Sequence, residues 1–431
     1  MNNYLKADNI ISGFLILGIT YLSIFNYKYF GPFIIVIYLY LNYFNFEVKL
    51  NKFYKYYPLI FYFLKFLFNI SEKFNYLHKS SIQLNYYEKA RFLDLQNLFL
   101  EWFCNSDNNL DYVFNFDIQY LRSCPYQNYW GPLSSLIKTP GINIWNATLS
   151  TSAIILICLS CIYISEYKKL SHNHFLLFVL SISPPVNFLI DRMNIDIVIF
   201  LVSFLMIKNI ENSLVLKLGI FSLFAQYKLH PIILIASICI YFLIKKNRKN
   251  FTISFIVFGL NIASIYQFYT NNTFYTARPF LSYRSFGILS DATFISKFLG
   301  SITVSYLIIC LILILLVYLL IKKTVESEIE LDSVFFNFSL WFLGVSLYSN
   351  YDYRIPILIF IFLKLFSLQI KLLNLSLLIF VFLSPFPISE TFINLKESNI
   401  FSANFIDITF YIIVGYIVKI NYFTIKSRLK T

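Results

Sequence analysis

Residues 183–207 read SPPVNFLIDRMNIDIVIFLVSFLMI, and within them the charged run Asp191-Arg192-Met193-Asn194-Ile195-Asp196 separates two apolar segments. Two carboxylates and an arginine within six residues are costly in a membrane unless they are paired or hydrated. Charge in such a place is typical of a substrate pathway, a catalytic site or a structural ion pair. Whether a membrane surrounds this run is decided by the composition of the whole chain.

The composition indicates a polytopic helical membrane protein. Apolar residues make up 58% of the 431 residues, charged residues 13%, and the mean hydropathy is +0.65, whereas soluble domains are about a quarter charged. Backbone groups in lipid must hydrogen-bond within their own segment, so apolar runs predict helices. We expect one all-α transmembrane domain over 1–431, with roughly 12–14 transmembrane helices. Its apolar segments include 143–164, 195–208, 213–227, 230–244 and 251–268.

The net charge of +13 does not indicate nucleic-acid binding, because lysine and arginine lie in short loops and not on a basic face of a soluble domain. These loops mark the cytoplasmic side. Alternating the spans between them places both termini in the cytoplasm and residues 72–142 outside, as an extracytoplasmic loop region. The turns at 191–194, 228–230 and 350–354 also fall outside, so we expect their charges at the outer surface and not in the interior. A composition rich in Lys, Asn, Ile, Phe and Tyr suggests a bacterial protein of the inner (plasma) membrane.

The first outer loop offers carboxylates and aromatic rings. Asp107, Asp111 and Asp117 are candidates for a general base, because a carboxylate held among aromatic residues near lipid can take up a proton from a substrate. An ordinary solvated loop would show the same residues. Cys104 and Cys124 share this loop, and the sequence is compatible with a disulfide or with two free thiols.

Two other outer turns offer cations. Tyr227-Lys228-Leu229-His230-Pro231 lies between two short apolar segments, and Pro231 is suited to begin the second. Lys228 as a point charge and His230 as a donor suit a phosphate, although a snorkelling lysine with a capping histidine is the simpler interpretation. Arg354 is suited to grip a phosphate with two hydrogen bonds, or to pair with Asp352.

These stretches together resemble glycosyltransferase family 87, the polyprenyl-phosphate-mannose-dependent mannosyltransferase-like enzymes of the GT-C superfamily. The run 191–196 is similar to the family's Arg-Gly-Asn-x-Asp motif, with Met193 in place of the glycine. The run 227–231 is similar to its Lys-x-Tyr/His-Pro turn. Three further likenesses are Asp107–Tyr112 to its acidic first loop, Pro125–Leu133 to its Pro-Tyr and Tyr-Pro-Pro-Leu, and Asp352–Arg354 to a late Asp-Tyr-Arg. The likeness covers roughly residues 105–355.

The resemblance implies a GT-C-like bundle and transfer of a mannose-like hexose from a polyprenyl-phosphate donor to a lipid or glycan acceptor, in cell envelope glycan biosynthesis. Asp111, with Asp107 and then Asp117 as second choices, would deprotonate the acceptor hydroxyl for an inverting attack. The remaining roles are donor phosphate binding by Arg192, Lys228, His230 and Arg354, orientation by Asn194, Asp196 and Asp352, and sugar contact by Tyr126, Tyr129 and Trp130. Family precedent makes a metal cofactor unnecessary, and no recognisable metal-ligand spacing is present, but a divalent metal stays open.

Two alternatives remain open on the sequence. An O-antigen-type polymerase or ligase would place its large external loop late in the chain and make it rich in arginine. A membrane transporter or flippase would favour broken helices with charges at mid-depth and an internal repeat. The largest external loop here is early and acidic, which favours the transferase.

Overall fold

The computed structural model describes residues 18–19, 32–37, 56–78, 133, 144–169, 174–271, 285–286, 288–322, 332–347, 350–351, 355–383 and 399–430. Nearly all of this part of the chain is helical. The helices, in chain order, are α3 (Tyr57–His78), α7 (Ile144–Lys169), α8 (His174–Ser181), α9 (Pro184–Arg192), α10 (Asp196–Ile207), α11 (Leu214–Tyr227), α12 (Pro231–Ile244), α13 (Arg248–Asn271), α14 (Ile288–Leu299), α15 (Ile302–Lys322), α16 (Ser333–Ser346), α17 (Pro356–Phe366), α18 (Lys371–Leu383) and α20 (Asn399–Lys430).

Two very short strands interrupt the helical pattern. β1 (Ser285–Phe286) pairs antiparallel with β2 (Asn350–Tyr351). The sequence predicts only helices, and this pairing is a local addition to them. It joins two segments that are far apart in the chain and that the charge pattern places on the same outer side.

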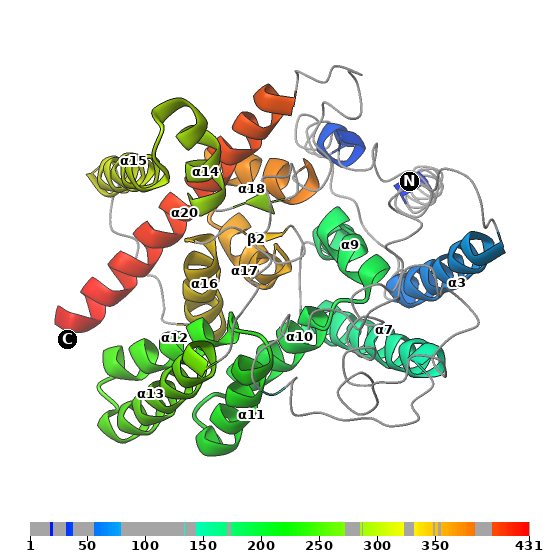
Figure 1. The fold of residues 1–431 in the computed structure, drawn as a ribbon, viewed down its shortest axis with the longest axis horizontal. Coiled ribbons are helices and arrows are strands. Elements are labelled where there is room, and N and C mark those ends of the chain that lie inside the picture. Colours follow the sequence, from blue (N-terminus) through cyan, green and yellow to red (C-terminus); the bar gives the residue numbers. More distant parts are fainter. Residues whose placement is uncertain are drawn as a thin grey trace, which may run out of the picture.

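Among the residues that the structure describes, four helical segments are long and apolar enough to cross a membrane, which supports a membrane protein. They are Asn146–Lys168, Arg248–Phe268, Ile302–Lys322 and Ile408–Arg428. A further eight apolar helices have 10–17 residues, so the predicted number of spans stays a prediction. In α13 and in α15, only 11% of the most apolar 18-residue stretch is buried inside the protein, against 61% in α20. Accordingly, α13 and α15 lie at the rim of the molecule, whereas α16 and α17 lie near its centre (Figure 1).

Aromatic side chains fill the core around α16. Trp341 and Phe338 of this helix are fully buried, with ring centroids 5.5 Å apart, and Phe200 of α10 packs edge-on against Trp341 at 5.4 Å. α16 also approaches α12 closely, since a Cβ atom added at Gly344 would lie 2.3 Å from Cγ2 of Ile233. Gly344 therefore allows this close approach, because any larger side chain would force Ile233 or the helices to shift.

Prolines set the starts of several helices that surround the site. Pro184, Pro231 and Pro356 each occupy the first turn of α9, α12 and α17. Proline suits this place because it has no N–H to leave unsatisfied and its φ angle is already helical. The predicted start of a helix at Pro231 is thus confirmed, and each of these helices begins next to a polar turn.

Candidate functional site

The charged run 191–196 is a tight break between α9 and α10. α9 ends at Met193, whose backbone is left-handed at φ 47° and ψ 53°, and whose N–H donates to the carbonyl groups of Leu189 and Ile190. A left-handed residue other than glycine costs roughly 1–2 kcal/mol. Met193 is itself fully buried, so its side chain packing offsets that cost. Glycine, which stands at this place in the family 87 motif, adopts the same backbone conformation without strain.

Asn194 fixes the start of α10. Its Oδ1 accepts a hydrogen bond of 2.9 Å from the backbone N–H of Asp196, which is a local turn that asparagine readily forms. Both residues are buried, with 2% and 0% of their surface exposed. The short Asn194 side chain therefore holds Asp196 in place through the backbone.

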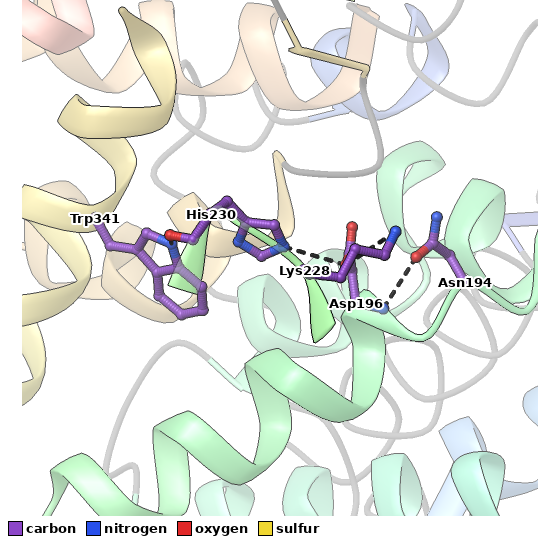
Figure 2. Close-up of polar contacts among 5 residues, drawn as sticks. All are labelled: Asn194, Asp196, Lys228, His230 and Trp341. Atoms are coloured by element: carbon purple, nitrogen blue, oxygen red, sulfur yellow. Dashed lines mark hydrogen bonds and ion pairs between the residues drawn. The ribbon is translucent and has the colours of Figure 1, made fainter. Parts of the chain in front are cut away.

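The Asp196 carboxylate lies next to Lys228 and His230 of the turn between α11 and α12, as Figure 2 shows. Its Oδ1 lies 3.1 Å from Nε2 of His230 and 3.6 Å from Nζ of Lys228. Because an ionised carboxylate only accepts hydrogen bonds, Nε2 is the donor in the first contact. The three side chains form a cluster that combines one negative and two potentially positive groups.

Aromatic packing fixes the imidazole of His230. The ring stacks on Trp341 at 5.5 Å with an interplanar angle of 21°, and Phe200 lies 5.9 Å away. The backbone carbonyl of His230 accepts a hydrogen bond of 3.0 Å from Nε1–H of Trp341 (Figure 2). With the ring held on one side by Trp341 and at Nε2 by Asp196, His230 has a single defined orientation.

Lys228 is the member of the cluster that is open to solvent or ligand. Its side chain is 13% exposed, against 4% for His230 and 0% for Asp196. It follows α11 in an extended conformation, so its chain reaches across to α10. A ligand that approaches the cluster meets this ammonium group first.

A second ion pair lies at the other end of the run. Nζ of Lys65, on α3, is 3.1 Å from Oδ1 of Asp191, and the two side chains are 0% and 7% exposed. Lys65 is not among the predicted site residues, although a single lysine within the apolar stretch YPLIFYFLKFLFNI of α3 indicates a buried charge that needs a partner. Asp191 and Asp196 are buried inside the protein, so their burial cost does not disappear as the charge pattern predicts, and the membrane side of the run stays a prediction. Charge patterns place a turn relative to the membrane but do not reveal which helices cover it.

The structure brings four of the predicted site residues together: Asn194, Asp196, Lys228 and His230. Arg192 is the last residue of α9, but its side chain lies outside the described part, so its orientation by Asn194 and Asp196 stays a prediction. Other predicted residues lie outside the described residues, namely Asp107, Asp111, Asp117, Tyr126, Tyr129, Trp130, Asp352 and Arg354, as do Cys104 and Cys124.

An apolar slot of about 180 Å³ lies along α7, α10 and α17, and Asp196, Lys228 and His230 are not among the residues that line it. Phe200 lines the slot and also contacts the His230 ring. Three helices supply stripes at i, i+3, i+4 and i+7, which lie on one helical face: Leu159, Ile162, Tyr163 and Glu166 of α7, Ile197, Phe200, Leu201 and Phe204 of α10, and Pro356, Ile359, Phe360 and Leu363 of α17. Seven residues of helix rise about 10 Å, so the slot is elongated along these helices.

The far end of the slot carries an ion pair. Glu166 of α7 lines the slot there and pairs with Lys208, the residue directly after α10. Nζ of Lys208 also lies 4.0 Å from the ring centroid of Phe204. The slot thus runs along α10 from Ile197, near the Phe200 ring that contacts His230, to a second charged pair.

Comparisons with known proteins gave no match. No protein-family model, curated protein or solved structure matches this chain. The resemblance to family 87 therefore stays a prediction, and function must be argued from the site. Over the ranges that the structure describes, no group of three or more His, Cys, Asp or Glu side chains is placed to hold a metal ion.

One titratable carboxylate lies away from the site. Asp291 of α14 accepts a hydrogen bond from the hydroxyl of Tyr411, on α20. Burial raises the pKa of Asp291 to about 6, although the hydrogen bond from Tyr411 acts in the opposite direction. This group sits outside the four candidate spans and links α14 to α20.

Proposed function

We propose that the protein is a multi-pass GT-C-like glycosyltransferase of the bacterial inner membrane. It transfers a sugar, a mannose-like hexose, from a polyprenyl-phosphate donor to a lipid or glycan acceptor on the extracytoplasmic face, with both termini in the cytoplasm. The observation that carries the proposal is the apolar slot whose lining residue Phe200 also contacts His230 of the Asp196–Lys228–His230 cluster. The sequence resemblance to family 87 points the same way.

The slot and the cluster together suit a phosphate on an apolar chain. Aliphatic and aromatic side chains line most of the slot, which favours a linear hydrocarbon over a polar ligand. Beyond Phe200, the ammonium of Lys228 and the imidazole of His230 offer positive charge and hydrogen-bond donors to a phosphate. A free sugar or a nucleotide would leave the slot unfilled.

Asp196 is better suited to hold these cations than to react. It is completely buried and already contacts both of them through Oδ1. A carboxylate in that position keeps Lys228 and His230 oriented before the donor arrives, so little reorganisation is needed during reaction. The general base is then a different carboxylate, for which Asp111 is the first choice.

The reaction follows from these roles. The carboxylate of Asp111 takes the proton of the acceptor hydroxyl, whose oxygen bonds to the anomeric carbon of the donor sugar from the side opposite the phosphate. The bond from that carbon to the phosphate oxygen breaks, and polyprenyl phosphate leaves. Lys228 and His230 stabilise the negative charge that develops on the leaving group, with Arg192 and Arg354 as further candidates.

A transporter or flippase is the second candidate. It is favoured by the break between α9 and α10, where Asp191 and Asp196 are buried and ion-paired, because broken helices with buried charges are typical of transporters. The same slot would then carry a lipid across the membrane without cleaving it. A transporter would leave the donor lipid chemically unchanged, whereas the transferase would release polyprenyl phosphate.

The deciding experiment supplies purified protein with radiolabelled polyprenyl-phosphate mannose, glucose and arabinose, together with an extract of membrane lipids and glycans. The transferase releases polyprenyl phosphate and labels an acceptor. A transporter leaves the donor intact but changes its sidedness in sealed vesicles. An O-antigen-type polymerase or ligase acts only when the donor is a lipid-linked oligosaccharide. Absence of any release with all three donors, from protein that binds them, would contradict the proposal.

A further inference from the structure

A polar bridge joins α11 to α13, which pack side by side (Figure 1). The side-chain nitrogen of Gln226 donates to Oδ1 of Asn261 over 3.0 Å, and Nδ2 of Asn261 donates to Oγ of Ser222 over 2.8 Å. The hydroxyl of Ser264 donates to Oε1 of Gln226 over 3.1 Å. We name these two residues of α11 and two residues of α13 the Asn261 bridge.

Asn261 lies in a largely apolar helix that is exposed over most of its surface. α13 contains the candidate span Arg248–Phe268, whose most apolar stretch is only 11% buried. Asn261 itself is buried, with 4% of its surface exposed. Lipid tails are as apolar as leucine, so apolar side chains gain little by leaving lipid for another helix, whereas hydrogen bonds between helices still favour association. The bridge is therefore a specific attachment between the two helices.

The bridge fixes the rotation of α11 about its own axis. Hydrogen bonds weaken steeply when their distance or angle is wrong, whereas apolar contacts have no required direction. Ser222 and Gln226 are four residues apart and share one face of α11, so Asn261 contacts that face at two points. A rotation of α11 would break both bonds. The buried stripe on α11 offers only apolar contacts at i, i+4, i+7 and i+11: Leu214, Leu218, Phe221 and Ala225.

The bridge lies in the last turn of α11, directly before Lys228 of the candidate site. Gln226 precedes Lys228 by two residues, and the backbone N–H of Lys228 donates to the carbonyl of Phe224 over 2.7 Å. The backbone of Lys228 is thus still tied to this turn. Its Nζ reaches across to α10, where it lies 3.6 Å from Oδ1 of Asp196. A rotation of α11 would therefore move the ammonium away from the carboxylate.

We propose that the Asn261 bridge positions Lys228. By fixing the rotation of α11, the bridge holds the Lys228 ammonium against Asp196. Asn261 acts through Gln226 and the backbone of α11, so it is a positioning residue and not a catalytic one. The placement of Lys228 does not depend on the reaction, whereas any effect on the donor rests on the function proposed above.

The first test measures how fast the Lys228 amine reacts with a trace of acetic anhydride, in full-length protein held in nanodiscs. Mass spectrometry of the peptides gives the rate relative to Lys364, which pairs with Asp332 at an exposed position. We expect Lys228 to react roughly threefold or more faster in Asn261→Leu than in the wild type, because the amine leaves Asp196 and becomes more exposed. An unchanged rate would overturn the proposal.

The matched control is Asn374→Leu. The amide of Asn374 donates to the carbonyl of Phe366, between α17 and α18, so its loss should not change the rate at Lys228. A rise in Asn374→Leu equal to that in Asn261→Leu would show a general loosening of the protein and would also overturn the proposal.

A double variant separates positioning from a purely structural role. Asn261→Leu alone leaves the amide of Gln226 without this partner, so the Tm should fall. Adding Gln226→Leu removes that amide, and Ser222 keeps its hydrogen bond to the carbonyl of Leu218, so the Tm should recover toward the wild-type value. No bond then fixes the rotation of α11, and the reaction of Lys228 should stay fast. A rate that returns to the wild-type value together with the Tm contradicts the positioning role.

The third test measures donor kinetics. Asn261→Leu should raise the donor KM roughly threefold to twentyfold, with a much smaller change in kcat. In a Lys228→Met background the same substitution should have no further effect, because it acts through Lys228. Equal effects of Asn261→Leu in both backgrounds contradict the proposal. If the wild-type protein transfers no sugar, the proposed function fails, and the labelling tests still decide whether the bridge positions Lys228.

Discussion

Replacing Lys228 with methionine should weaken donor use without unfolding the protein. The side chain keeps its length but loses the ammonium group that is the exposed member of the cluster. Asp196 keeps its contact with His230 at 3.1 Å, so its carboxylate retains a partner. We therefore expect the folded state to survive and the loss to fall on phosphate binding.

The magnitude follows from the geometry. Opposite unit charges about 4 Å apart attract by about 4 kcal/mol at an effective dielectric constant of about 20. Lost hydration offsets part of this attraction, and a hydrogen bond to a charged group is worth about 1.5–3 kcal/mol net. We expect kcat/KM for the donor to fall about 10- to 150-fold, mainly through a higher donor KM.

The assay is the release of polyprenyl phosphate at varied donor concentration, with the Tm measured in parallel. Lys217→Met on α11 is the matched control, because Lys217 bonds to a backbone carbonyl of Asn209 and not to the cluster. Lys228→Arg should retain part of the activity, since it keeps the charge. A Lys228→Met protein with the wild-type Tm and wild-type kcat/KM would refute the assignment of Lys228 to the donor phosphate.

Three further predictions concern the base, the packing and the pH response. Asp111→Asn should abolish sugar transfer while donor binding, measured by equilibrium binding, stays near wild type; full activity in Asp111→Asn would move the base elsewhere. Gly344→Val should lower the Tm, because its side chain would collide with Ile233, and Ile233→Ala should restore part of the loss; an unchanged Tm in Gly344→Val would contradict the close approach of α12 and α16. The raised pKa of Asp291, about 6 against 3.8, means that its contribution to stability is fully present below pH 3.8 and is lost as the pH rises through about 6. This contribution is at most about 3 kcal/mol, and the pH dependence of the Tm that it causes should be absent in Asp291→Asn. In Tyr411→Phe, the pH range over which the Tm falls should move to higher pH, because the hydrogen bond that lowers the pKa of Asp291 is lost.

The sequence predicts the helices near the site better than it predicts their surroundings. Apolar runs and prolines correctly give the break between α9 and α10 and the start of α12 at Pro231. These features are local, because a proline or a charged turn ends an apolar run whatever lies around it. The grouping of Lys228 and His230 also follows from their closeness in the chain.

The partners of the charged run could not be predicted, because they depend on tertiary packing. Lys65 reaches Asp191 from a helix that is far away in the sequence. Trp341 reaches His230 from α16. The left-handed backbone conformation of Met193 could not be predicted either, because methionine rarely adopts it.

In the function that we propose, the apolar slot and the Asp196–Lys228–His230 cluster together bind a lipid phosphate. The most direct test is photocrosslinking with a polyprenyl phosphate that carries a diazirine on its chain, followed by peptide mapping. We expect adducts on slot residues of α7, α10 and α17, such as Phe200, Phe204 and Ile359, and we expect excess unlabelled polyprenyl phosphate to suppress them. Adducts confined to the exposed faces of α13 and α15, and insensitive to competition, would contradict it.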